Sequence, residues 1–98
     1  MLMVRDVVYC KAGKVRPMVE KFLATAKLVE RRGLGTARVY TDVSAERYWT
    51  VVGEFDVESL EAFQSIGKGD EADEFAKIWE GYHDLVDHGR REIYTVEG

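Results

Sequence analysis

The chain has 98 residues, 46% hydrophobic and 33% charged, a length and composition that suit one folded domain over residues 1–98 and argue against intrinsic disorder. No apolar run approaches the roughly 20 residues of a membrane helix, so we expect no membrane-embedded segment. The net charge of −4 argues against non-specific binding to nucleic acid.

The chain opens with a predicted strand and helix. A valine-rich run over residues 4–9 predicts a strand, which Gly13 then ends. From Val15 to Arg32 the apolar residues recur every three or four positions, which predicts a helix with one apolar face. Pro17 lies in the first turn, where proline is tolerated, and Gly33 is expected to cap the C-terminal end.

The first strand ends at Cys10, the only cysteine in the chain. A single cysteine forbids an internal disulfide and is typical of a reducing compartment. The residues Met1 to Arg5 also lack the apolar region of a signal peptide, so we expect a cytoplasmic protein. Lys11 is a cation that could lower the pKa of the Cys10 thiol, but a small packing residue is the favoured interpretation.

A hairpin is predicted in the middle of the chain. Residues 34–42 and 47–55 alternate apolar and polar side chains, and the short loop between them favours antiparallel pairing. Asp56 is then expected to cap a helix that carries Leu60 and Phe63 on its apolar side.

The segment Gly67-Lys68-Gly69 is expected to interrupt this helix and to form a flexible break, a candidate lid over a pocket. A second helical piece is predicted from Asp70 to Gly89, because its apolar residues again recur at helical spacing. Residues 90–96 are predicted to form the last strand.

The predicted element order is β-α-β-β-α-β. Because crossover connections are right-handed, both helices are expected on one face of a four-stranded antiparallel sheet, an α+β ferredoxin-like fold. Residues 1–49 hold 10 Lys/Arg and 5 Asp/Glu, whereas residues 50–98 hold 4 and 13. No linker separates the halves, so a basic helix is expected to lie beside an acidic one.

The other face of the predicted sheet would carry mixed apolar and polar side chains. An aromatic, half-apolar face of this size is seldom left bare on a monomer, so we predict a homodimer in which a second copy covers it. The residues expected on this face include Arg38, Tyr40, Tyr48, Val52 and Tyr94.

Four short segments support a family resemblance. They are Lys11–Val15 before the first helix, Val51–Phe55 in the third strand, Ser59–Phe63 at the next helix and Arg91–Tyr94 in the last strand. Together they resemble the dimeric α/β-barrel superfamily, in particular its antibiotic-biosynthesis monooxygenase and NIPSNAP-type families. The resemblance implies a homodimer whose two sheets close a barrel, with a small-molecule pocket in each subunit.

The sequence departs from that superfamily in one respect. Its cofactor-free monooxygenases and haem-degrading enzymes typically depend on a pocket asparagine, and this chain contains no Asn. The absence weighs against an oxygenase and against an acylphosphatase, whose fold is also ferredoxin-like. An RNA-recognition domain is disfavoured because residues 47–55 lack its glycine spacing.

His83 and His88 are the only histidines. On one helix, His83 with Asp87 and Asp84 with His88 would each be four residues apart, a spacing that suits two metal ligands. No other histidine completes such a site, so we predict no metal and no cofactor. His83 borders the apolar stripe beside Tyr82 and is the candidate catalytic base, with a surface or packing role as the alternative.

The candidate ligand-binding residues combine polar and aromatic side chains of the sheet with aromatic residues of the last helix. Tyrosine hydroxyls and one arginine on an apolar wall could orient a small aromatic or carboxylated ligand. Alternatively, the sheet residues bond across the dimer interface and the helix aromatics pack in the core. The predicted set is Arg38, Tyr40, Tyr48, Glu54, Trp79, Tyr82 and Tyr94.

Three functions stay open at this point. The favoured hypothesis is a small homodimeric protein that binds an apolar or aromatic molecule between sheet and helices without demonstrated catalysis. The second is a cofactor-free oxygenase-like or isomerase-like enzyme on a small aromatic metabolite, and the third is a ligand-free interaction dimer. A deep pocket that contains His83 favours the enzyme, and a solidly packed sheet interface favours the interaction dimer.

Overall fold

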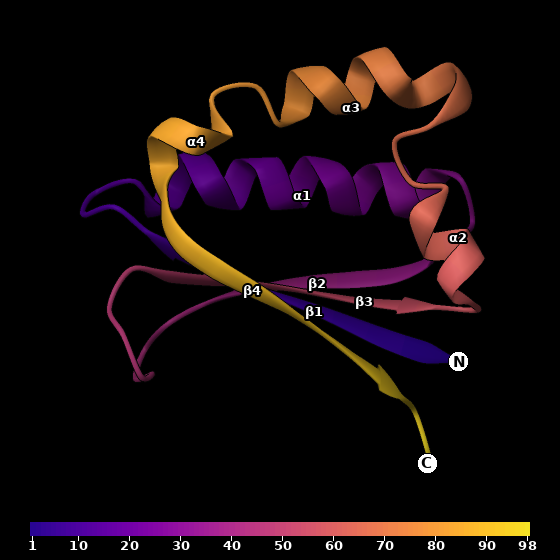
Figure 1. The fold of residues 1–98 in the computed structure, drawn as a ribbon, viewed down its shortest axis with the longest axis horizontal. Helices are drawn as coiled ribbons and strands as arrows, with labels where there is room; N and C mark the ends of the chain where they lie inside the picture. Colours follow the sequence, from indigo (N-terminus) through magenta and orange to yellow (C-terminus); the bar gives the residue numbers. More distant parts are fainter.

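The computed structural model describes residues 1–98 and contains one antiparallel sheet (Figure 1). Its strands are β1 (Leu2–Cys10), β2 (Gly35–Thr41), β3 (Thr50–Val57) and β4 (Val86–Thr95). The spatial order is β2-β3-β1-β4, so β1 is central and pairs with β3 on one side and β4 on the other. The predicted ferredoxin-like α+β fold is confirmed.

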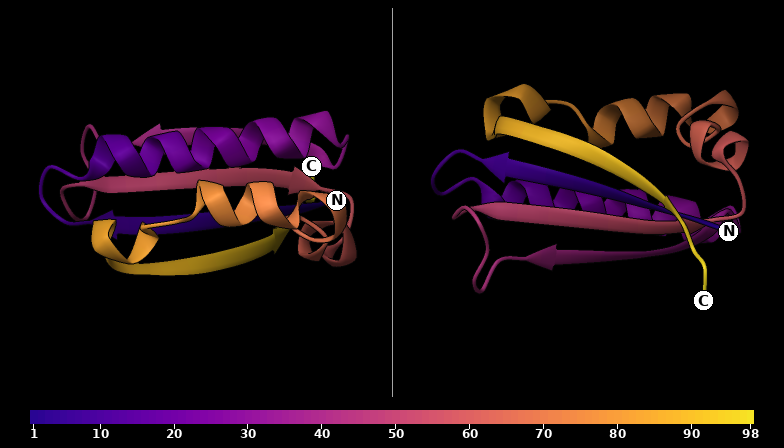
Figure 2. Two further views of the ribbon diagram at one scale, coloured as in Figure 1. Left: turned by 90° about the horizontal axis from the view of Figure 1, so that it is seen from above. Right: turned by 60° about the horizontal axis from the view of Figure 1, so that its bottom comes forward.

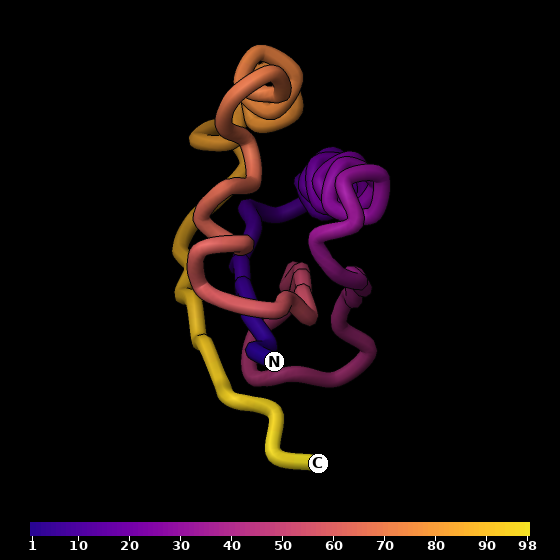
Figure 3. The backbone as a smooth tube through the Cα atoms, turned by 90° about the vertical axis from the view of Figure 1, so that its right-hand side faces the viewer, coloured from indigo at the N-terminus to yellow at the C-terminus, as the bar shows by residue number.

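All helices cover the same face of the sheet (Figures 1 and 2). They are α1 (Val15–Arg31), α2 (Leu60–Gln64), the 3-10 turn η1 (Gly69–Glu71), α3 (Ala72–Ile78) and α4 (Tyr82–Leu85). Helix α1 packs on β2 and β3, whereas α3 packs against α1 and lies farther from the strands (Figure 3). None of these helices is long and apolar enough to cross a membrane. The opposite side of the sheet is uncovered, and we call it the open face.

The core follows the alternation in the strands. Val4 and Val8 of β1 and Val51 of β3 point to the helices and are buried, as the period of two requires. Phe22 and Val29 from the apolar face of α1 close over them. The helix predicted from Val15 is therefore confirmed, and so is the alternation predicted for Val51 and Phe55, whereas Trp49, predicted on the same face, lies before the strand. The core lies between α1 and the centre of the sheet.

The expected pairing of a basic and an acidic helix is also observed. Arg31 of α1 lies 2.6 Å from the carboxylate of Glu74 in α3. Lys21 donates hydrogen bonds to the carbonyl oxygens of Ile78, at 2.7 Å, and Glu80, at 2.5 Å. Because Lys21 binds the carbonyls left free where α3 ends, it fixes this end of α3 to α1.

The second helical region differs from its prediction. Asp56 belongs to β3 rather than capping a helix, and the Ser59 side chain caps α2 by accepting a hydrogen bond from the Ala62 amide at 3.1 Å. The helix predicted to continue to Gly89 ends much earlier, because Gly81 takes a left-handed conformation with φ 78°. Strand β4 already begins at Val86.

The β2–β3 connection is longer than predicted, since β3 starts at Thr50. Asp42 closes the loop, with its carboxylate accepting a hydrogen bond from the Thr50 amide at 2.8 Å. Trp49 has a positive φ of 62°, which is uncommon for a residue with a side chain. The loop protrudes on the side of the sheet away from the helices and borders the open face (Figure 1).

Candidate functional site

The sheet separates the predicted site residues into two groups. Arg38, Tyr40, Glu54 and Tyr94 all point to the open face, as the strand register requires. Trp79, Tyr82 and His83 lie on the other side, between the helices and the sheet. Tyr48 joins neither group, because it stands on the β2–β3 loop with 84% of its surface exposed. The predicted residues therefore do not form a single site.

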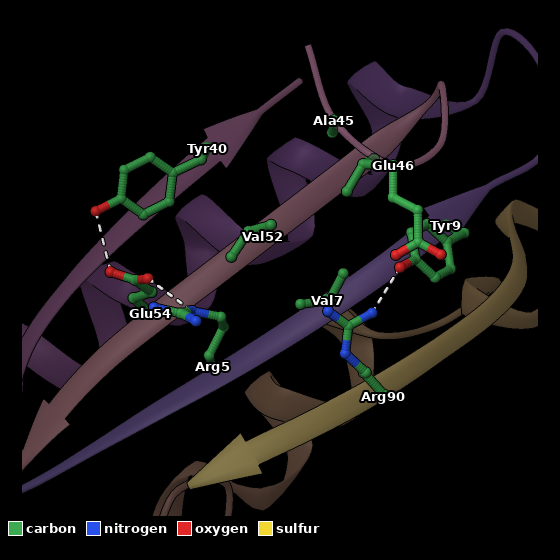
Figure 4. Close-up of a pocket in the computed structure, with 10 residues that line it drawn as sticks. Arg5, Val7, Tyr9, Tyr40, Ala45, Glu46, Val52, Glu54 and Arg90 are labelled. Carbon is green, nitrogen blue, oxygen red and sulfur yellow. Dashed lines mark hydrogen bonds and ion pairs between the residues drawn. The ribbon is translucent and has the colours of Figure 1, made fainter. Parts of the chain in front are cut away.

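A network of charged and phenolic groups covers the middle of the open face (Figure 4). Arg5 Nε donates to Glu54 Oε2 at 2.9 Å, and the Tyr40 hydroxyl donates to Glu54 Oε1 at 3.1 Å. Arg5 also lies 3.5 Å from Glu92. Hydrogen bonding to Glu54 raises the pKa of Arg5, so the guanidinium stays charged. The Arg38 guanidinium lies over the Tyr40 ring, 5.6 Å from its centre.

Glu92 connects this network to β4. It accepts hydrogen bonds from Arg90 Nε at 2.8 Å and from the Tyr94 hydroxyl at 3.0 Å. The hydrogen bond from Arg90, and to a lesser extent that from Tyr94, lowers the pKa of Glu92 below its ordinary value. The hydrogen-bonded groups of this network thus satisfy one another within one chain.

A shallow hollow of about 340 Å³ lies beside this network on the open face. Val7 and Val52 form its apolar floor, and Tyr9 lies at the end near the β2–β3 loop (Figure 4). Arg90 Nη1 donates to the Tyr9 hydroxyl at 2.5 Å, while the Arg47 guanidinium lies 4.6 Å from the Tyr9 ring centre. The hollow is small and open, so it offers little enclosure to a ligand.

A larger cleft of about 930 Å³ lies between α3 and strands β1 and β4, and we call it the helix-side cleft. It exists because α3 rests on α1 rather than on the sheet. Its walls are aromatic and are supplied by the sheet, α1, α2 and the α3–α4 segment. The aromatic residues that line it are Phe22, Phe55, Phe63, Phe75, Trp79 and Tyr82.

Trp79 is fixed at the back of this cleft. Its indole Nε1 donates to the Thr25 hydroxyl at 3.0 Å, and its ring packs edge-on against Phe22 with the centres 5.2 Å apart. Tyr82 also packs edge-on against the Trp79 ring, with the ring centres 5.6 Å apart. Because the polar atom of Trp79 is already bonded, the indole presents an apolar surface to the cleft.

The floor of the helix-side cleft carries an ion pair on the sheet. Arg91 Nε donates to Asp6 Oδ1 at 2.5 Å, and Arg91 Nη2 donates to Asp6 Oδ2 at 3.1 Å. The Arg91 guanidinium also lies 4.9 Å from the centre of the Phe63 ring. Hydrogen bonding to Asp6 raises the pKa of Arg91, so the guanidinium is charged at every physiological pH.

His83 also lines this cleft, with its ring packed against Tyr82 at 5.2 Å. The hypothetical metal pairs fail, because His88 belongs to β4 and stacks on Tyr9 at 5.7 Å instead of sharing a helix with Asp84. No cluster of three metal-ligating side chains is found. Cys10 is buried in the core, and burial raises the pKa of its thiol, so a neighbouring cation does not activate it.

Asp6 and Arg91 are the site residues that sequence reasoning missed. A signal was present, since Asp6 is the one charged residue among the helix-facing positions of β1, where Leu2, Val4 and Val8 are apolar. An acidic group at a core position of a strand breaks the binary pattern, and such breaks are expected at functional sites. Arg91 carries no such signal, because charged residues surround it in the last strand.

No family model and no curated protein matches the sequence, but solved structures match the fold over the whole chain. A provisionally named antibiotic biosynthesis monooxygenase from Deinococcus radiodurans has a TM-score of 0.77 and 10% identity, covering 100% of this chain and 94% of its own. An uncharacterised NIPSNAP domain protein from Burkholderia xenovorans has a TM-score of 0.69 and 15% identity, with 99% and 95% covered. A dimeric protein of unknown function from Bacteroides fragilis has a TM-score of 0.68 and 9% identity, with 97% and 96% covered. The expected resemblance is confirmed at the level of fold: the chain has the ferredoxin-like fold of antibiotic biosynthesis monooxygenase-like and NIPSNAP domain proteins.

Proposed function

We propose that this protein binds a small aromatic molecule in the helix-side cleft. The observation that carries the proposal is a cleft of about 930 Å³ with six aromatic side chains on its walls. Its size lies within the usual range for small-molecule sites, and aromatic walls with a few polar groups are typical of them. Trp79 and Tyr82 serve as ligand-contacting residues.

Calorimetric titration with 2-naphthamide, a neutral planar aromatic compound, tests this function. The wild-type protein binds it, and Ile66→Trp abolishes binding because Ile66 lines the cleft and a larger side chain there fills it. Val96→Trp adds the same ring at an exposed position near the C-terminus and leaves binding unchanged. Equal binding by both variants would place the ligand elsewhere and refute the proposal.

We propose further that a second copy of the chain covers the open face. This face carries Tyr40 and Tyr94, both exposed, above the apolar side chains Val7 and Val52. Tyrosine and arginine are enriched at protein interfaces, which supports an interface role for Arg38, Tyr40 and Tyr94 over a ligand-binding one. Glu54 lies among them and accepts a hydrogen bond from Tyr40. The Bacteroides fragilis protein of the same fold is described as dimeric.

Sedimentation velocity tests the dimer with two matched variants. Tyr94 on the open face and Leu23 on α1 are similarly exposed, at 48% and 45%. Tyr94→Asp places a charge in the proposed interface and yields a monomer, whereas Leu23→Asp leaves the dimer intact. A wild-type monomer at micromolar concentration, or equal effects of the two substitutions, would contradict this arrangement.

A second candidate function is catalysis in the same cleft, with His83 as general base. His83 lines the cleft and packs edge-on against Tyr82, so its imidazole lies within reach of a bound molecule. This favours isomerase-like proton transfer over an oxygenase-like reaction. His83→Ala is expected to abolish turnover while retaining ligand affinity, and unchanged turnover would exclude His83.

The free, buried Cys10 supports a cytoplasmic location.

A further inference from the structure

The charges that face the helix-side cleft are unevenly distributed. Asp6 is the only acidic residue that lines it, whereas Lys68 and Arg91 are both basic. Arg90 also touches the cleft, but its guanidinium is held on the open face by Tyr9 and Glu92. Although the protein carries a net charge of −4, the helix-side cleft is thus locally basic. Such a cleft attracts anions and disfavours cations.

The pairing of Arg91 leaves part of its guanidinium available. Asp6 accepts from Nε and Nη2, and Nη1 makes no hydrogen bond within the chain. The guanidinium carbon lies over the Phe63 ring and Asp6 binds two of the guanidinium nitrogens, so these contacts orient the group before any ligand arrives. A planar, oriented guanidinium with free donors is suited to carboxylates and similar oxyanions.

The position of the ion pair indicates binding rather than stabilisation of the fold. Asp6 and Arg91 are opposite one another on β1 and β4, at helix-facing positions where apolar pairs would pack the sheet more effectively. The side chain of Asp6 is 18% exposed and that of Arg91 is 53% exposed, so the arginine is the partner that reaches the solvent of the cleft.

We propose that the helix-side cleft selects aromatic molecules that carry an oxyanion, such as a carboxylate, and that Arg91 binds this group while Asp6 holds Arg91 in position. The inference rests on the proposed function and specifies its ligand class. The aromatic part of the ligand lies against Trp79 and Tyr82, and Lys68 adds a second positive charge at the rim. Asp6 acts through Arg91 and is a positioning residue.

Calorimetry with 2-naphthoate and 2-naphthamide tests the proposal, because these compounds have the same ring and nearly the same shape and differ in charge. At neutral pH the wild-type protein is expected to bind the naphthoate about tenfold more tightly, the order of effect of one charge-assisted hydrogen bond. Arg91→Met removes this preference by weakening naphthoate binding about tenfold, while naphthamide binding changes by less than about twofold. Arg91→Lys retains an intermediate preference.

Two further variants make the test independent of folding defects. Asp6→Asn keeps an oxygen that can still accept a hydrogen bond from Arg91 and hold it in position, but it removes the negative charge that repels an anion. This variant is expected to strengthen naphthoate binding without strengthening naphthamide binding. Arg16→Met removes an exposed arginine at the start of α1, away from the cleft, and leaves both affinities unchanged. Circular dichroism confirms that each variant is folded before titration.

The outcomes separate the two proposals. If naphthamide and naphthoate bind equally to the wild-type protein, the cleft is an aromatic site without charge selection, and this inference fails while the proposed function stands. The inference also fails if Arg91→Met weakens both compounds alike, or if Asp6→Asn does not alter their ratio. If neither compound binds, both proposals are refuted.

Discussion

Asp6 and Arg91 lie directly opposite each other on β1 and β4, and two hydrogen bonds join them on the helix-facing side of the sheet. Their neighbours on that side, Val4 and Val8, are buried in the core. The charged pair therefore marks the place where the core ends and the helix-side cleft begins.

The coupling between Asp6 and Arg91 is measurable by a double-mutant cycle. Asp6→Asn, Arg91→Met and the double variant are compared by urea unfolding. We expect a coupling free energy of about 1 kcal/mol, because one partner is half exposed and solvent screens the attraction. A coupling much larger than this would mean that the pair holds the fold together, and an interpretation as a ligand-binding group would lose its support.

The hydrogen bond between Trp79 and Thr25 anchors α3 to α1. The Trp79 indole Nε1 donates to the Thr25 hydroxyl at 3.0 Å. Thr25→Val keeps the shape of the side chain but removes this hydroxyl, so the indole loses its acceptor. We expect a loss of about 1 kcal/mol in the free energy of unfolding, with a shift in Trp79 fluorescence. Thr25→Ser retains the hydroxyl and is the control, and equal effects of the two substitutions would show that the bond is not formed.

Gly53 allows Phe22 to pack directly on the sheet. A Cβ atom at Gly53 would lie 2.5 Å from the Phe22 ring, so the ring would have to move. We expect Gly53→Ala to destabilise the protein by about 1–3 kcal/mol through overpacking. Phe22→Leu in the same chain should recover part of that loss, and strictly additive effects of the two substitutions would contradict the contact.

Glu92 gives the open face a predictable response to acid. Its pKa is lower in the folded protein than the ordinary 4.5, so the folded state binds its proton less readily than the unfolded chain does. Ionised Glu92 therefore stabilises the folded state fully above its ordinary pKa. This stabilisation is lost as the pH falls through the lower pKa that Glu92 has in the folded protein. Between about pH 5 and about pH 3, the wild-type protein should therefore lose more stability than Glu92→Gln. The free energy of unfolding of both proteins is measured with denaturant at each pH. An equal loss of stability in both would argue against the hydrogen bonds of Glu92.

The sequence was sufficient for the fold because its strongest patterns are local. The helix starting at Val15 has an uninterrupted apolar face, and Val4, Val8 and Val51 follow the alternation of strands. The region after Phe75 was harder to predict. Trp79, Tyr82 and Val86 continue a helical spacing, but Gly81 breaks the helix and Val86 enters the sheet instead.

The candidate site could be predicted only in part. Trp79, Tyr82 and His83 were identified, and they do lie together in one cleft. Their separation from Tyr40 and Tyr94 depends on the register of the sheet, because a shift by one residue moves a side chain to the opposite face. The size of the cleft depends on α3 standing away from the sheet, a tertiary arrangement that no local pattern encodes.

The central claim, binding of an aromatic molecule in the helix-side cleft, is tested most directly by NMR on the two tryptophan indoles. Trp79 lines the cleft, whereas Trp49 belongs to the loop beside the open face. Titration with 2-naphthoate is expected to shift the indole N–H signal of Trp79 and to leave that of Trp49 in place. A shift of Trp49 alone, or no shift of either signal at saturating concentration, would contradict the account.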